Sequence, residues 1–243
     1  MILYNLFPLL AGPFSKWSGH LTRAAGMGFE WVFVNPIQQL GASRSLYSIA
    51  DYFSFNPALL DPASAAAPVE QVRQMTAQAH AAGLKVMIDL VINHSAIDAP
   101  LTREHPEWFV REKNGRIANA SCQHEHKKVV WKDLAQFDHR HTRDAEGLYR
   151  HCLRIVEFLL SLGFDGFRCD AAYQLPKPFW QRLLREIKAR HCYQGCADAQ
   201  AHVHDHLHAV DMKKRQHRNE NVLRLQWHAG FELRNIACAI AVC

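Results

Sequence analysis

The stretch Gly163-Phe164-Asp165-Gly166-Phe167-Arg168-Cys169-Asp170-Ala171-Ala172 decides the fold of this chain. It begins with a glycine that ends a predicted helix, continues as a short apolar strand, and finishes with Arg168 and Asp170. Residues two apart on a strand project to the same side, so this guanidinium and carboxylate are expected to lie together. The C-terminal end of a parallel strand is where α/β barrels keep their chemistry, although a structural Arg–Asp pair fits the same pattern.

The preceding chain alternates apolar strands with amphipathic helices. Strands are predicted near 2–6, 29–34, 84–91 and 163–169, and helices near 15–27, 68–82, 142–162 and 179–189. Ser15 is expected to cap the first helix, and 38–62 is expected to be a long polar loop. Such alternation predicts an α/β fold with a parallel sheet, either doubly wound or half of a TIM barrel. No Gly-x-Gly-x-x-Gly follows the first strand, which disfavours a dinucleotide-binding fold.

Composition narrows the class of protein and its partners. The 243 residues are 49% hydrophobic and 21% charged, as in a globular domain of barrel size. The net charge of +5 comes from scattered Lys and Arg, so no nucleic-acid partner is expected. No apolar run approaches the ~18 residues of a membrane span, and no signal-peptide layout is present. We therefore expect a cytoplasmic protein without a membrane partner. Its seven cysteines form no Cys-x-x-Cys pair, which argues against a disulfide framework or a zinc knuckle.

Polar side chains follow three successive predicted strands, and such groups converge on one pocket in a parallel barrel. The residues concerned are Tyr47 and Asp51 after the second strand, Asp89, Asn93 and His94 in and after the third, and Arg168 and Asp170 in and after the fourth. A carboxylate beside an arginine stays ionised, as an attacking group requires. A histidine can bond to a hydroxyl, and a tyrosine ring offers a flat face to a sugar.

These segments resemble the α-amylase superfamily, glycoside hydrolase family 13. Asp89–His94 is similar to its Asp-x-x-x-Asn-His signature, and Gly163–Ala172 to its Gly-x-x-Gly-x-Arg-x-Asp-Ala signature. Three further segments are similar to family motifs, namely Phe29–Ile37, Tyr47–Tyr52 and Trp131–Ala135. The resemblance covers roughly 1–190. It implies the N-terminal half of a TIM (β/α)8 barrel, with a small subdomain at 95–140 inserted after the third strand.

The resemblance also implies roles for individual residues. Asp170 would be the nucleophile that forms a covalent glycosyl intermediate, and Arg168 would hold it ionised and in place. The residues implied to bind or support an α-glucan or maltooligosaccharide are Tyr47, Asp51, Asp89 and His94. In many members the residue matching Asn93 helps to hold a calcium ion, while a plain structural asparagine is the alternative. No other cofactor is implied.

Two departures leave the reaction open. Tyr173-Gln174 stand where many amylases have Lys-His, so acceptor-side contacts differ. His105–Phe109 and Pro178–Trp180 are similar to the maltosyltransferase branch, which builds glucan from maltosyl phosphate. A hydrolase or transglycosylase acting on α-glucans is therefore the first hypothesis and a maltosyl-phosphate enzyme the second. A non-catalytic carbohydrate-binding protein or a degraded remnant is the third.

The segment 191–243 differs from the body of the chain. Retaining hydrolysis needs a second carboxylate to protonate the leaving oxygen, and the family takes this glutamate from its fifth strand. After Arg190 we find no apolar run ending in Glu, so we expect this chain to be inactive as it stands. The alternating histidines at 202, 204, 206 and 208 are compatible with a transition-metal patch on a strand. The other interpretation is an atypical His- and Cys-rich tail produced by a frameshift.

Overall fold

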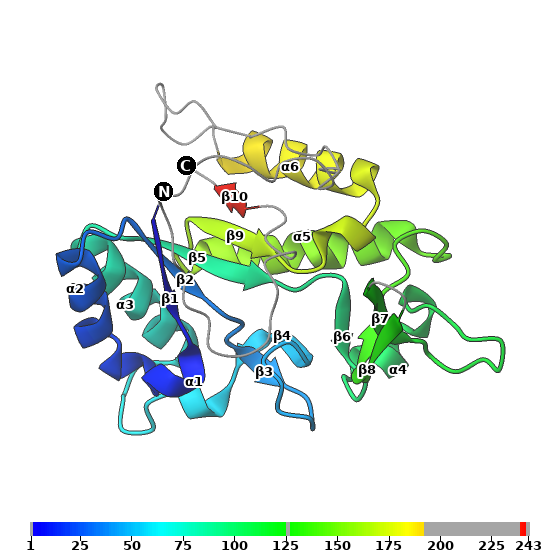
Figure 1. The fold of residues 1–243 in the computed structure, drawn as a ribbon, viewed down its shortest axis with the longest axis horizontal. Helices are drawn as coiled ribbons and strands as arrows, with labels where there is room; N and C mark the ends of the chain where they lie inside the picture. The colour runs from blue at the N-terminus through cyan, green and yellow to red at the C-terminus, as the bar shows by residue number, and fades with distance from the viewer. Residues whose placement is uncertain (1, 125–126, 192–238, 242–243) are drawn as a thin grey trace.

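The computed structural model describes residues 2–124, 127–191 and 239–241. Its main sheet has the strand order β1-β2-β5-β9-β10 (Figure 1). The first four strands are parallel, and β10 pairs antiparallel with β9. The bounds are β1 Leu3–Leu6, β2 Trp31–Val34, β5 Lys85–Leu90, β9 Gly166–Cys169 and β10 Ala239–Ala241. The predicted α/β class and parallel sheet are confirmed, and β10 adds an antiparallel strand that the sequence did not indicate.

Helices make the connections between the parallel strands. The bounds are α1 Pro8–Ala11, α2 Ser18–Gly26, α3 Pro68–Ala81, α4 Leu101–Glu104, α5 Ala145–Ser161 and α6 Lys177–His191. α3 begins at a proline, where a missing N–H costs nothing, and is followed by Gly83 at φ +78°. Asp144 caps α5 by accepting from the Gly147 amide. These local signals explain why both helices match their predicted bounds closely.

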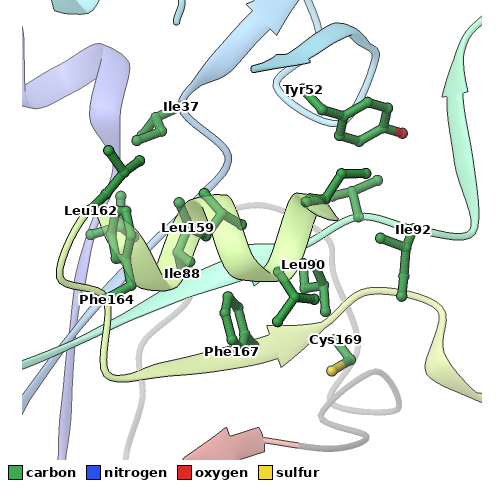
Figure 2. Packing of buried hydrophobic residues seen from close by; sticks show 14 of the residues in the cluster. Ile37, Tyr52, Ile88, Leu90, Ile92, Leu159, Leu162, Phe164, Phe167 and Cys169 are labelled. Atoms are coloured by element: carbon green, nitrogen blue, oxygen red, sulfur yellow. The ribbon is translucent and has the colours of Figure 1, made fainter. Parts of the chain in front are cut away.

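The core lies between the parallel strands and the helices that cover them. Figure 2 shows Ile88 and Leu90 of β5 and Phe167 of β9 packed with Leu159 of α5. All four side chains are at most 1% exposed. Burying an aliphatic or aromatic side chain of this size contributes about 1.5–3 kcal/mol. This packing fixes the positions of β5 and β9 relative to each other. It therefore also fixes the positions of the polar side chains at the ends of these strands.

Between β5 and α5 the chain forms a separate small sheet, in the segment 95–140 where a subdomain is predicted. Its antiparallel strands follow the order β6-β8-β7, with β6 at His94–Ala96, β7 at Asn119–His124 and β8 at Lys127–Gln136. Short 3-10 turns also occur in the chain: η1 Phe14–Lys16, η2 Pro57–Leu59, η3 Pro106–Trp108 and η4 Ala172–Gln174. β6 pairs with β8 directly after β5 ends, so the small sheet lies beside the strand ends of the main sheet (Figure 1).

Two local predictions are wrong. The segment 38–62 is not wholly a loop, because β3 (Gln38–Leu40) and β4 (Ile49–Phe55) form an antiparallel hairpin. Its apolar residues are buried by contacts distant in sequence, which its polar composition does not reveal. Ser15 does not cap α2 but lies in η1, and Trp17 precedes the helix without a side-chain cap.

The predictions made for 191–243 mostly fall outside the described residues. This holds for the histidines at 202, 204, 206 and 208 and for the segment where the family's acid would be expected. Within the described residues, the three free cysteines are Cys122, Cys152 and Cys169.

Candidate active site

Arg168 joins two strands and two carboxylates. It lies opposite Asp89 in the register of β9 on β5. Its Nη1 donates to Asp89 Oδ1 at 2.8 Å and to Asp170 Oδ1 at 2.8 Å. Burial acts to lower the pKa of Arg168, but the two carboxylates outweigh it and raise the pKa above its ordinary value. A permanent positive charge thus lies between the carboxylates, as the period-2 spacing of Arg168 and Asp170 predicts.

Asp89 is fully buried, and both of its oxygens are engaged. Oδ1 accepts from Arg168, while Oδ2 accepts from the Tyr47 hydroxyl at 2.8 Å and from Asn35 Nδ2 at 3.4 Å. Burial raises the pKa of Asp89 to about 6, against the opposing effect of Arg168. With 0% of its side chain exposed, Asp89 has no face left for a ligand. Asp89 therefore holds the side chains of Arg168 and Tyr47 in position through these hydrogen bonds.

Asn35 and Asn5 extend this network and were missed in the sequence. Asn35, which is 6% exposed, donates from Nδ2 to the Tyr47 hydroxyl at 3.1 Å as well as to Asp89. Its own Oδ1 accepts from Asn5 Nδ2 at 3.3 Å. Asn35 directly follows β2, and Asn5 lies in β1. The rule that polar groups at strand ends converge applies to Asn35 as well, and this signal could have found it.

His94 and Tyr47 are two residues that the resemblance implies to bind the sugar. His94 is 5% exposed, and both ring nitrogens are buried, with the Tyr47 backbone as their nearest polar partner. Burial lowers the pKa of His94, so the ring is neutral at neutral pH and offers one donor and one acceptor. The Tyr47 hydroxyl is taken by Asp89, which holds the ring in one orientation, and burial raises its pKa.

Asp170 has a more open setting than Asp89. Its side chain is 19% exposed, and its amide donates to the Leu90 carbonyl at 3.0 Å, which continues the β5–β9 pairing. The next residue, Ala171, is left-handed at φ +47°. This left-handed residue follows β9, which ends at Cys169, and leads into η4. Asp170 is therefore the carboxylate of the pair that a ligand can reach.

Asp51 is not brought into this cluster by any described contact. Its carboxylate accepts from Ser54 Oγ at 2.6 Å and from the Phe53 amide at 2.9 Å, within its own strand β4. A role for Asp51 in binding substrate therefore finds no geometric support here.

The surroundings of Asn93 do not fit a calcium ion. Its Oδ1 accepts from Gln136 Nε2 at 2.9 Å, so the oxygen that a cation would use is already bonded. Within 2–124, 127–191 and 239–241, no group of three or more His, Cys, Asp or Glu is placed to hold a metal. The structural interpretation of Asn93 is the one that the contacts support.

Residues 2–123, half of the chain, match the family described as the glucanotransferase domain of glycogen debranching enzyme. The chain belongs to the α-amylase superfamily. Among curated members, it is 31% identical over 219 residues to an α-1,4-glucan:maltose-1-phosphate maltosyltransferase from Arcanobacterium haemolyticum, covering 77% of this chain and 30% of that protein. The corresponding enzyme of Mycolicibacterium smegmatis is 29% identical over 198 residues, covering 73% and 26%. The chain thus spans less than a third of the length of these relatives.

Solved structures give the same α-amylase fold. An α-amylase from Lactobacillus plantarum matches with a TM-score of 0.64 and 26% identity, over 78% of this chain and 42% of that one. A maltogenic α-amylase from Thermotoga neapolitana also gives 0.64 and 26%, over 78% and 43%. The expected relation to a TIM barrel with an inserted subdomain is therefore confirmed at the level of fold. No helix among the described residues is long and apolar enough to cross a membrane.

Proposed function

We propose that this chain carries the nucleophile side of a retaining active site for α-glucans, with Asp170 attacking the anomeric carbon of a glucosyl unit. The observation that carries the proposal is the sharing of Arg168 Nη1 by Asp89 and Asp170 at 2.8 Å each. The Asp89 side chain is 0% exposed, whereas the Asp170 side chain is 19% exposed and lies beside the positive charge of Arg168. Of the two carboxylates, only Asp170 combines the pairing to Arg168 with an exposed side chain.

In the first step an Asp170 oxygen would form a bond to the anomeric carbon, while the bond to the leaving group breaks and its electron pair departs with that group. Arg168 keeps the carboxylate oriented. His94 would contact a hydroxyl of the same sugar after a small movement that exposes its buried ring, and the fixed Tyr47 ring would cover the apolar face of the sugar. Water or an acceptor hydroxyl would then release the sugar with net retention.

Protonation of a glycosidic leaving oxygen needs a second carboxylic acid. Asp89 is unsuited to that role because both of its oxygens are bonded and none of its side chain is exposed. No other acid approaches Asp170 among the contacts of the described residues. We therefore expect this chain to act on natural glucans slowly or not at all, and to reveal its nucleophile only with a substrate that needs no acid.

A glycosyl fluoride supplies such a substrate, since fluoride leaves without a proton. Incubation with 2-deoxy-2-fluoro-α-maltosyl fluoride should form a stable ester with Asp170, because the electron-withdrawing fluorine slows its hydrolysis. Intact-mass spectrometry should show one added fluoromaltosyl group, and digestion should place it on the peptide that contains Asp170. Asp170→Asn should stay unlabelled, and Asp138→Asn, which removes a carboxylate bonded only to nearby residues, should label like the parent. Label on another residue, or none on a chain with cooperative unfolding, would refute the proposal.

A second candidate is transfer from maltosyl phosphate, favoured by the maltosyltransferase names of the curated relatives. Phosphate is a better leaving group than a sugar alkoxide, so this donor depends less on a strong acid. If the candidate is right, incubation with maltosyl phosphate and maltohexaose should release phosphate and lengthen the acceptor by two glucosyl units. Cleavage of maltohexaose alone with no phosphate release from the donor would instead favour a hydrolase.

A further inference from the structure

The side-chain amide of Gln136 lies where the strand ends of the main sheet meet the small sheet. Gln136 ends β8, and its Nε2 donates to two oxygens of one residue, the Asn93 carbonyl at 3.0 Å and Asn93 Oδ1 at 2.9 Å. The same carbonyl also accepts from the Phe137 amide at 3.1 Å. A carbonyl oxygen has two lone pairs, so it is saturated. Asn93 is 2% exposed, which means that water does not compete for these oxygens.

A second amide continues the chain toward Asp170. Asn93 Nδ2 donates to Gln174 Oε1 at 3.1 Å, and Gln174 Nε2 donates to the Ser121 carbonyl of β7 at 3.1 Å. Gln174 ends η4, four residues after Asp170. The bonds run in one direction through Asn93 and Gln174, because each of these two amides donates its N–H to one neighbour and accepts at its oxygen from another. Neutral side chains thus tie β8, the end of β5, the turn after β9 and β7 together.

We propose that this amide clasp, formed by Asn93, Gln136 and Gln174, takes the place of a divalent cation at the junction between the two sheets. A cation bound by Asn93 would use oxygens such as its Oδ1, and Gln136 Nε2 already donates to that oxygen and to the Asn93 carbonyl. The amide supplies the partial positive charge without the ion. The clasp therefore holds the small sheet and the turn after Asp170 in place, and the fold needs no calcium. This inference does not depend on Asp170 being the nucleophile.

Thermal unfolding of the whole chain tests the proposal. With the parent protein, the Tm in EDTA and in 10 mM CaCl2 should agree within about 1 °C. Gln136→Glu places a carboxylate against the two Asn93 oxygens, so its Tm should fall in EDTA. Added calcium should bridge these oxygens and raise the Tm of this variant by about 5 °C or more. Gln78→Glu, the same charge change on the exposed face of α3, serves as the matched control and should show no response to calcium.

Two results would overturn the clasp. The first is a parent protein whose Tm drops in EDTA and recovers with calcium. The second is a folded Gln136→Glu variant that calcium does not stabilise, since that would show that the Gln136 amide does not occupy a cation position. If that variant does not fold, terbium luminescence of the parent, excited through tryptophan, decides the point. Saturable binding of terbium that calcium displaces would contradict the proposal, and its absence would support it.

Discussion

The Tyr47 hydroxyl donates to Asp89 Oδ2 at 2.8 Å, across 42 residues of sequence. This bond ties the turn between β3 and β4 to the buried strand β5 and sets the orientation of the Tyr47 ring. Among the residues that the structure describes, the other donor to Oδ2 is Asn35, at 3.4 Å. The phenol is therefore the stronger partner of a carboxylate oxygen that has no access to water.

Tyr47→Phe should destabilise the fold, because it removes that donor and leaves a buried oxygen poorly satisfied. The expected loss is about 1–3 kcal/mol in the free energy of unfolding, measured by urea denaturation. Tyr4→Phe is the matched control and should change stability by less than about 0.5 kcal/mol. Equal losses in the two variants would show that the Tyr47–Asp89 bond contributes nothing specific.

Replacing Arg168 should lower the free energy of unfolding far more than replacing an exposed arginine. Arg168→Met leaves Asp89 buried beside no cation, with an expected loss of about 3–5 kcal/mol. Arg182, which is 44% exposed and pairs with Glu146, should cost at most about 1 kcal/mol when changed to Met.

A double-mutant cycle separates the Arg168–Asp89 pair from general damage. Asp89→Asn removes the buried charge, so the double variant with Arg168→Met should lose less stability than the sum of the two single variants. The free energies come from denaturant titrations at one pH. Simple additivity would mean that Arg168 and Asp89 are not coupled.

Stability should fall as the pH drops from about 6.5 to 4, through His151. Burial lowers the pKa of His151 from 6.5 to about 4. Between these two pH values the unfolded chain binds a proton at His151 and the folded chain does not, which favours the unfolded state. The contribution of neutral His151 to the free energy of unfolding is complete above the pKa of the unfolded chain. It is lost as the pH falls toward the pKa of the folded chain, and the loss is at most about 3 kcal/mol. His139, whose pKa is also lowered by burial to about 4, adds a loss of the same sign.

The variant His151→Phe isolates this contribution to the pH dependence. His151 packs among Tyr52, Phe53 and Trp108, and its Nε2 has no partner, so a phenyl ring suits the site. Unfolding free energies at pH 4.5 and 7.5 should differ less in this variant than in the parent. His141→Phe, at a side chain that is 82% exposed, should keep the parental difference. Asp89 acts in the opposite direction, since its raised pKa favours the folded state below about 6 and that gain is lost as pH rises.

Ala171→Gly should stabilise the chain. Ala171 is left-handed at φ +47°, a conformation that costs an L-residue about 1–2 kcal/mol and glycine very little. Glycine also adds entropy to the unfolded chain, which offsets part of this gain. The free energy of unfolding, measured by urea denaturation, should therefore rise by about 0.5 kcal/mol. Ala172→Gly, one residue later at a buried position in η4, should destabilise instead. A loss of stability in Ala171→Gly would show that the left-handed turn carries no strain.

Several features of the fold follow from local signals and could be predicted. The α5 helix has its Asp144 cap, α3 its proline at the start and Gly83 after its end, and Arg168 and Asp170 share a face through the period of a strand. Patterns of this kind depend only on residues close in sequence, so they can be interpreted without knowing how the rest of the chain folds. The β3–β4 hairpin was missed because its buried positions are decided by α5 and the small sheet, which lie far away in sequence.

The sequence by itself determined the alternation of strands and helices, the family and the identity of Asp170 as the candidate nucleophile. Only the tertiary structure decided that the Asp170 carboxylate is partly exposed and the Asp89 carboxylate is buried. Asp89 and Arg168 are 79 residues apart, yet the register of β5 on β9 sets them opposite each other. The same holds for Asn35 and for the Gln136 amide at Asn93. Hydrogen bonds of this kind depend on positions fixed to within a few tenths of an ångström by packing, and no local pattern of residues encodes such distances.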